Sequence, residues 1–448
     1  MSHGDMDEQK RRAKLVRKTA KKLRWQVALL VDLQGPKIRV ENFAGGEAKL
    51  TSGDHFTLDA SDPATPGDHR RVGVSYPDLA NDVNPGDILL LDDGLISMQV
   101  QSLDNGRVHC LVENGGVLKN RKGLNLQGGG LSVSGLAEHD LPHIELAAEI
   151  GADYVAVSFV SSADDIDRAR GLLRKAGSEA SIVAKIERME GIENLEEICD
   201  TADVIMVARG DLGVEIGDEE LPGLQKRIIR KGIRHNRIVA TATQMMQSMV
   251  ENPIPTRAEV LDVANAVLDG TDAVMLSAET AVGKHPVKVI EAMNRICLGA
   301  ERHFEAEGDV VHLNVRFERI DQAIAMAAMY MATNVSVQAI VALTESGSTA
   351  QWLSRVQSSV PIYAFSTNSA SRRKMAMFRD VFPVKQEATS DDPDEVVGEA
   401  MRTLLAHGAV KDDDRIIVTM GDQMSKSGGT NTFRFIKLDA EGRARYRV

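Results

Sequence analysis

The chain has 448 residues, of which 43% are hydrophobic and 26% charged, and its formal net charge is −12 at pH 7. This length predicts two or three domains, and the negative charge argues against a general nucleic-acid binder, whose surface must be basic. No apolar run approaches the roughly 20 residues of a membrane helix, and three cysteines without CxxC spacing suit a reducing compartment rather than a disulfide framework or a zinc site. We therefore expect a cytoplasmic protein with neither a membrane nor a nucleic-acid partner.

The residue composition and hydrophobic pattern change twice in the N-terminal third of the chain. Residues 10–24 are strongly basic, and because acidic residues precede them we expect a solvated amphipathic helix rather than a transit peptide. The apolar run Val27–Gly35 ends in polar residues and predicts a buried strand. From Glu41 to about Asn125, short alternating stretches are separated by turn signals such as Pro85-Gly86, so this region predicts a small all-β module inserted after the first strand.

Between Ile182 and Thr280 four apolar runs end in polar clusters, namely SIVAKIERMEG, DVIMVARGDLGVEIG, RIVATATQMMQSM and DAVMLSAET. This pattern is typical of strands that are buried on both faces and carry chemistry at their carboxyl ends. Stretches of helix-forming composition separate the runs, so the chain predicts a (β/α) barrel of the TIM type with its active site on the C-terminal face. We expect six barrel strands, where a complete barrel has eight, beginning at Val27, Asp153, Ile182, Asp203, Ile238 and Asp272.

A third pattern begins at about Val315. A helix precedes the strands AIVALTESG and PIYAFS, a further helix is expected from Ser348 to Gln357, and DRIIVTMG is expected as the last strand, which together predict an α/β domain. The segment Thr344–Thr349 fits either a phosphate-binding loop or an ordinary capped helix, so no effector is predicted. The expected division is a barrel domain at 1–39 and 126–314, an inserted β domain at 40–125, and a C-terminal α/β domain at 315–448.

The residues at the strand ends suggest the chemistry of the barrel. Glu187 and Asp211 end neighbouring strands, so their carboxylates can meet above the barrel mouth, and two carboxylates with open positions suit Mg²⁺. Lys185 lies two residues before Glu187 on the same face of its strand, where its charge can meet the oxygens of a phosphoryl group in transfer. The turn at Gly210 and Asp211 can present backbone N–H groups to a small carboxylate, and Thr243 supplies a hydroxyl at the end of the next strand.

Each of these residues also has an ordinary structural interpretation. An acidic residue at a strand end is commonly solvated or caps a helix, and Lys185 alone fits a salt bridge at the barrel mouth. The order KIE, ARGDLG, ATQM and PTRAE at strand-sized spacing favours a phosphoryl-transfer site over these alternatives.

The run from Ile182 to Pro286 resembles the pyruvate kinase family throughout, and VDLQGPKIRV (Val31–Val40) is similar to the family's DTKGPEIRTG. The similarity continues through DILLLDDG and TESGSTAQWLSR to GDQMSKSGGTNTFR near the C-terminus. It implies a barrel domain, an inserted β-barrel domain that acts as a lid, and an α/β C-terminal domain, in a homo-oligomer that is usually a tetramer. The implied reaction is the last step of glycolysis, in which phosphoenolpyruvate donates its phosphoryl group to ADP to give pyruvate and ATP.

The resemblance also implies a role for each residue that matches a family motif. Lys185 corresponds to the lysine that stabilises the moving phosphoryl group, and Glu187 and Asp211 to the ligands of Mg²⁺ or Mn²⁺. Gly210 and Asp211 correspond to the backbone donors to the substrate carboxylate, and Thr243 to the threonine associated with protonation of the enolate. Arg39 and Lys122 correspond to basic residues that meet the nucleotide and phosphates when the lid closes.

The sequence departs from the family at its start. Family members open with two barrel strands that end in TxGP and R-x-N-F-S-H-G, whereas this sequence begins MSHGDM, so only Ser2 and His3 remain of the second motif. We expect the reading frame to continue upstream into those two strands, which in-frame DNA sequence would test. Ser2, Asp32 and Leu33 would then be remnants of the family's site for a monovalent cation.

A second departure concerns K⁺. Lys37 stands where many members carry a glutamate that accompanies a bound K⁺. Because its ammonium can supply that charge internally, we expect activity that is largely independent of K⁺.

Two other functions remain open at this stage. A metal-dependent aldolase acting on pyruvate-like substrates would use a similar Glu/Asp pair, but it needs no phosphoryl-binding lysine and lacks the lid and C-terminal domains. The other alternative is a catalytically impaired homologue that retains only assembly or regulatory contacts, because two absent strands would leave the barrel open.

Overall fold

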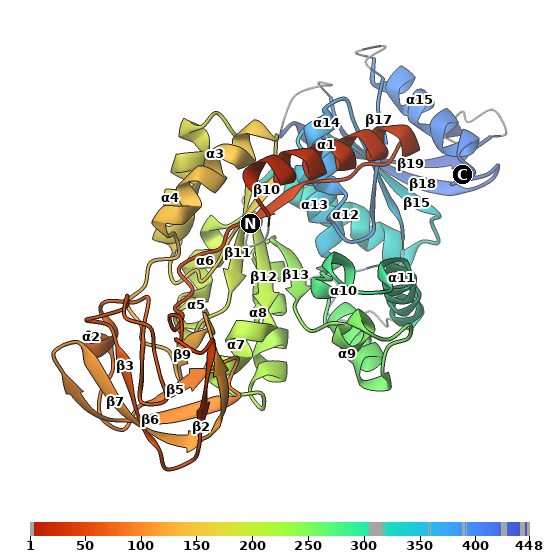
Figure 1. Cartoon of the computed structure of the whole chain (residues 1–448). Coiled ribbons are helices and arrows are strands. Elements are labelled where there is room, and N and C mark those ends of the chain that lie inside the picture. Colours follow the sequence, from red (N-terminus) through yellow and green to blue (C-terminus); the bar gives the residue numbers. More distant parts are fainter. Residues whose placement is uncertain are drawn as a thin grey trace.

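The computed structural model describes residues 4–303, 317, 319–356, 358, 360–387, 390, 392–422, 428–439 and 444–445. Figure 1 shows a parallel sheet with helices around it, an all-β unit at one end and an α/β unit at the other. Among the described residues, no helix combines the length and apolar character needed to cross a bilayer.

The parallel sheet carries the strands predicted for the barrel. Its order is β1-β10-β11-β12-β13-β14, and all neighbours pair in parallel. The strands are β1 (Leu30–Asp32), β10 (Tyr154–Val157), β11 (Ser181–Ile186), β12 (Val204–Ala208), β13 (Ile238–Ala242) and β14 (Ala273–Val274). The prediction of six strands is confirmed, whereas the expectation of two more upstream concerns residues outside this sequence and stays a prediction.

Helices lie around this sheet (Figure 1), and α3 to α8 pack apolar side chains into its core. They are α1 (Met6–Leu23), α3 (Leu141–Glu149), α4 (Ala163–Lys175), α5 (Met189–Glu193), α6 (Leu195–Thr201), α7 (Arg209–Ile216), α8 (Leu221–Arg234), α9 (Arg257–Leu268), α10 (Ala278–Ala281) and α11 (Pro286–Arg302), with 3₁₀ turns η1 (Glu138–Asp140) and η2 (Gln247–Val250). In α8, Ile228 and Ile229 are fully buried against the core that includes Ile205 and Val239. A capping box between Thr256 and Glu259 fixes the start of α9.

The all-β unit lies between β1 and β10 in the chain. It contains β2 (Glu47–Leu50), β3 (His55–Asp59), β4 (Arg71–Gly73), α2 (Leu79–Asp82), β5 (Ile88–Leu91), β6 (Ile96–Asp104), β7 (Arg107–Asn114), β8 (Gly116–Lys119) and β9 (Leu124–Leu126). The strands form a sheet of order β4-β3-β7-β6-β5-β9 and a β2-β8 pair around a core that includes Phe56, Leu89 and Met98. This unit has its own core and is therefore a separate domain. We call it the lid domain, after the role that the family resemblance implies for the inserted β domain.

The C-terminal unit is an α/β sheet of order β17-β16-β15-β18-β19-β20. Its elements are α12 (Ile320–Asn334), β15 (Ala339–Leu343), α13 (Ser348–Arg355), β16 (Ile362–Ser366), α14 (Ser369–Met375), β17 (Val381–Lys385), α15 (Pro393–Ala406), β18 (Arg415–Gly421), β19 (Thr430–Leu438) and β20 (Ala444–Arg445). The expectation that DRIIVTMG is the last strand is wrong, because β19 pairs antiparallel with β18 over most of its length. The alternating sequence TNTFRFIKL is the signal that the Gly- and Ser-rich segment before it obscured.

Asp272, just before β14, joins the barrel to the C-terminal unit. Arg355 of α13 binds both of its carboxylate oxygens, one of them at 2.9 Å, and the backbone N–H of Arg379 donates to it at 3.0 Å. The side chains of Arg355 and Asp272 are only 7% and 1% exposed.

We expect the Asp272→Ala substitution to lower the free energy of unfolding by about 3–5 kcal/mol, because it leaves the Arg355 guanidinium buried without a counter-charge. Urea unfolding followed by circular dichroism measures the change. The control is Glu387→Ala, which removes an exposed pair with Lys385 and should cost less than about 1 kcal/mol. Equal effects of the two substitutions would contradict the prediction.

Candidate active site

The predicted site residues lie at the carboxyl ends of three neighbouring strands. Lys185 is in β11, and Glu187 is the first residue after that strand. Asp211 is in the first turn of α7, which follows β12, and Thr243 is the first residue after β13. Because β11, β12 and β13 run parallel and are adjacent, these residues meet at one edge of the sheet.

Lys185 is the centre of a polar cluster. Its Nζ lies 3.1 Å from Oε1 of Glu187 and 3.2 Å from Oδ1 of Asp32, and it donates to Oγ of Ser158 at 2.7 Å. Burial acts to lower the pKa of this ammonium, but the charges of Glu187 and Asp32 outweigh burial and raise it. Lys185 therefore stays positively charged throughout the physiological range.

Glu187 is the most perturbed carboxylate of the cluster. It is 3% exposed, and its Oε2 accepts a hydrogen bond of 2.8 Å from the N–H of Phe159. Burial raises its pKa to about 7; Lys185 opposes this shift and the negative charge of Asp211 adds to it. Two carboxylates that repel each other in a buried site are a good environment for a cation.

Asp211 forms an ion pair that the sequence did not predict. Nζ of Lys37, from the segment that leads into the lid domain, lies 2.5 Å from Oδ1 of Asp211. The same ammonium is 4.0 Å from Oδ1 of Asp93 in the lid domain. Lys37 therefore places a fixed positive charge between the barrel and the lid domain.

Thr243 is held in an unusual backbone conformation. Its φ is +66°, a left-handed value that a β-branched residue rarely adopts, and the next residue, Gln244, has φ +54°. The hydroxyl donates to the carbonyl of Ala242 at 2.7 Å and accepts from the N–H of Gly210 at 2.8 Å. The conformation thus aims the hydroxyl at the start of α7, where Gly210 and Asp211 lie.

The structure does not bring the two predicted nucleotide-binding residues into this cluster. Arg39 donates to the carbonyl of Arg121 at 2.9 Å and pairs with Gly123, and Lys122 forms a 2.6 Å ion pair with Asp92. These contacts lie within the lid domain and the segments that join it to the barrel.

Of the three residues predicted as remnants of a monovalent-cation site, the structure describes two. Asp32 lies beside Lys185, as described above. Leu33 is buried, and its carbonyl accepts a hydrogen bond of 2.9 Å from Ser158. Ser2 lies outside the described residues.

Sequence reasoning missed Ser158 and Phe159, which support Lys185 and Glu187 respectively. Both follow β10, the strand that was predicted to begin at Asp153 and from whose end no site residue was predicted. The signal used for the other strands, a polar residue just after a buried run, would have found Ser158.

Glu187 and Asp211 are the residues suited to a divalent cation. No group of three or more His, Cys, Asp and Glu side chains that could hold a metal occurs in the part of the chain that the structure describes. A cation bound by these two carboxylates must complete its coordination with water and substrate oxygens, as Mg²⁺ commonly does.

A buried ammonium beside carboxylates, at the C-terminal edge of a (β/α) sheet, is an arrangement suited to the transfer of a phosphoryl group, and with the fold it fits a phosphotransferase of the barrel type. The sequence model of the pyruvate kinase barrel domain matches residues 1–290, and that of the pyruvate kinase alpha/beta domain matches residues 322–436. The chain belongs to the pyruvate kinase family.

Individual relatives agree over nearly the whole chain. Pyruvate kinase II of Salmonella typhimurium is 49% identical over 444 residues, which are 98% of this chain and 92% of that protein. The pyruvate kinase of Haemophilus influenzae is 48% identical over 96% of this chain and 90% of its own length, and that of Geobacillus stearothermophilus is 40% identical over 97% and 74%. The family's reaction, phosphoryl transfer from phosphoenolpyruvate to ADP in glycolysis, is therefore assigned to this chain, and the aldolase alternative is dropped. The family generally requires a divalent cation and K⁺ and is generally oligomeric.

Proposed function

We propose that phosphoryl transfer takes place at the ends of β11, β12 and β13, with Lys185 as the residue that meets the phosphoryl oxygens. The supporting observation is the burial of its ammonium, 12% exposed, between two carboxylates that keep it charged. In a site of low dielectric constant, a fixed positive charge stabilises the charge that develops during transfer far more than it would in water. As the phosphorus–oxygen bond of phosphoenolpyruvate breaks, a new bond forms to the terminal oxygen of ADP.

Glu187 and Asp211 are the proposed ligands of Mg²⁺, and Mn²⁺ fits the same oxygen donors. When bound, the cation would neutralise charge on the phosphate and substrate oxygens. Burial raises the pKa of Glu187 and the negative charge of Asp211 adds to this shift; a bound cation would relieve the repulsion between the two carboxylates, which supports this role.

The start of α7 is the proposed binding site for the substrate carboxylate. The backbone N–H groups of Gly210 and Asp211 are at the N-terminus of this helix, where the helix dipole favours a negative group. Thr243, whose hydroxyl already contacts Gly210, is placed to support protonation of the enolate carbon that becomes the methyl group of pyruvate.

The lid domain is proposed to close over this site and bring Arg39 and Lys122 to the nucleotide phosphates. This proposal keeps the division into a barrel at 1–39 and 126–314, a lid at 40–125 and an α/β domain at 315–448. It also includes a cytoplasmic homotetramer, by analogy with the family. Asp32 and Leu33 would border the region that holds a monovalent cation in K⁺-dependent members.

Removal of divalent metal tests the proposed site. Pyruvate formation from phosphoenolpyruvate and ADP, coupled to NADH oxidation by lactate dehydrogenase, is expected to fall by more than about a hundredfold in EDTA and to return with Mg²⁺ or Mn²⁺. The Glu187→Gln variant should need a higher Mg²⁺ concentration for half-maximal activity.

Two results would count against these assignments. Activity that is unchanged in EDTA would exclude the carboxylate pair as a required metal site. A folded chain without activity at any metal concentration would favour the alternative of a homologue that retains only assembly or regulatory contacts.

A further inference from the structure

Two segments of chain connect the lid domain to the barrel. The first runs through residues 33–40, and the barrel holds its start because Asp140 accepts hydrogen bonds from the N–H groups of Gln34, at 3.0 Å, and Gly35. The second leaves the lid domain after β9 and runs through residues 127–136, which we call the return segment. Asp165 and Arg168 of α4 bind its end, at Ser134 and Gly135. Three further charged residues, which none of the roles above uses, bind the part nearer the lid domain.

Arg188 binds the backbone of the return segment. Its guanidinium donates to the carbonyl of Val133 at 2.9 Å, to the carbonyl of Leu131, and to Oε1 of Glu190 at 3.0 Å. That same Glu190 oxygen accepts a hydrogen bond of 2.7 Å from the N–H of Gly130. The Arg188 side chain is only 5% exposed, so these bonds form away from water, where they are strong.

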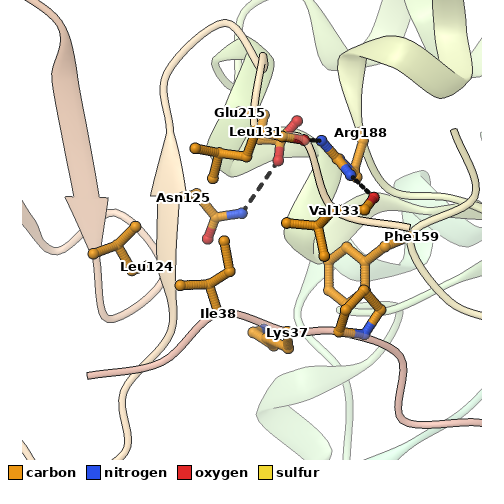
Figure 2. Close-up of a pocket in the computed structure, with 10 residues that line it drawn as sticks. Lys37, Ile38, Leu124, Asn125, Leu131, Val133, Phe159, Arg188 and Glu215 are labelled. Carbon is orange, nitrogen blue, oxygen red and sulfur yellow. Dashed lines mark hydrogen bonds between the residues drawn. The ribbon is translucent and has the colours of Figure 1, made fainter. Parts of the chain in front are cut away.

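Glu215 contacts β9 and the start of the return segment. Its carboxylate accepts from the side-chain amide of Asn125, in β9, at 3.4 Å and from the N–H of Met189 at 3.1 Å. Its backbone carbonyl accepts from the N–H of Gly128 at 2.9 Å. Figure 2 shows Arg188 and Glu215 meeting Asn125, Leu131 and Val133 around a pocket between the lid domain and the barrel.

This cluster is built on the same two strand ends as the metal-binding carboxylates. Arg188 follows Glu187 directly, and Glu215 lies on α7 four residues after Asp211, one helical turn away. The anchor of the lid domain and the candidate metal site therefore share rigid elements, which fixes the position of one relative to the other.

We propose that Arg188, Glu190 and Glu215 form a clamp that sets the position of the lid domain over the active site. They are positioning residues, because they contact the return segment rather than the substrate. The inference rests on the proposed function in that Lys122 belongs to the lid domain and Arg39, in the segment that leads into it, pairs with the lid residue Gly123. A loosened clamp spreads the lid domain over more orientations, so ADP binding weakens while phosphoenolpyruvate and metal, bound by the barrel, are little affected.

The test uses the Arg188→Lys, Glu215→Gln and Asn125→Ala variants of the whole chain. Lysine keeps the charge of Arg188 but cannot reproduce a planar fork that binds two carbonyls and a carboxylate together. Each variant is expected to raise KM for ADP, and for Arg188→Lys the rise is about tenfold, equivalent to about 1.4 kcal/mol. KM for phosphoenolpyruvate is expected to change by less than about twofold, on the same reasoning.

The matched control is Arg237→Lys. Arg237 is also a part-buried arginine that donates to two backbone carbonyls, those of Cys199 and Asp200, but its partners belong to α6 of the barrel rather than to the return segment. We expect both KM values to stay at the parent level in this variant.

A distance measurement separates a positioning role from a general loss of stability. Spin labels on Gln101→Cys in the lid domain and Lys175→Cys in α4, in a Cys297→Ser background, report the distance between lid and barrel by double electron–electron resonance. Both label positions are exposed. Arg188→Lys is expected to broaden the distance distribution, and Arg237→Lys is expected to leave it unchanged.

Equal increases in both KM values, or parent-like KM and distance distributions in the clamp variants, would overturn the proposal. If Arg188→Lys does not fold, Glu215→Gln and Asn125→Ala decide the result in the same way. An inactive parent protein would instead contradict the proposed function, so the two failures can be told apart.

Discussion

Replacing Lys185 with methionine is expected to lower kcat for pyruvate formation by about a thousandfold. Methionine has a similar length and fills the same space, but it removes the positive charge that Glu187 and Asp32 hold in place. The variant therefore loses stabilisation of the charge that develops during phosphoryl transfer, which lowers kcat. KM for ADP should change much less than kcat. Steady-state kinetics with both substrates measures this, and circular dichroism confirms that the variant is folded.

Two controls accompany this experiment. Lys231→Met, on α8, removes a more exposed ion pair with Glu196 of α6 and should leave kcat unchanged. Lys185→Arg keeps the charge and should recover part of the activity, although the larger guanidinium cannot occupy the same position. If Lys185→Met retained more than about a tenth of the parent kcat, the central role proposed for Lys185 would be wrong.

Activity without K⁺ is expected to stay within about twofold of activity with K⁺, since Lys37 already supplies a positive charge 2.5 Å from Asp211. The Lys37→Glu variant should lose about a hundredfold in K⁺-free buffer and regain most of that in K⁺, because the new carboxylate repels Asp211 until a cation lies between them. The assay compares potassium and tetramethylammonium chloride at equal ionic strength, so that general screening is the same in both.

Lys37→Met distinguishes the loss of the ammonium from the gain of a carboxylate. It removes the charge without creating a cation ligand, so its activity should fall and K⁺ should not restore it. Strong activation of the parent protein by K⁺ would show that the Lys37 ammonium does not replace the monovalent cation.

The sequence was sufficient for the six barrel strands and for four of the residues at their ends. Lys185, Glu187, Asp211 and Thr243 follow buried apolar runs, and parallel strands necessarily bring their carboxyl ends to one edge of the sheet. That local pattern, together with the spacing, predicted the composition of the site before any contact was known.

Contacts between distant segments could not be predicted in this way. Lys37 and Asp211 are 174 positions apart, and Asn125 and Glu215 are 90 apart. Their pairing depends on how the lid domain is oriented on the barrel, which no periodicity encodes. The orientation also explains why Arg39 and Lys122, although present in the expected motifs, lie among lid and linker residues in this structure.

The left-handed conformations of Thr243 and Gln244 bear on attempts to make this enzyme more heat-resistant. Each such residue costs on the order of 1–3 kcal/mol relative to a relaxed backbone, and glycine would remove most of that cost. Libraries screened only for thermal tolerance should therefore enrich glycine at these two positions. Glycine at position 243 would remove the hydroxyl that contacts Gly210. Selection for thermal stability alone would therefore favour a substitution that lowers activity.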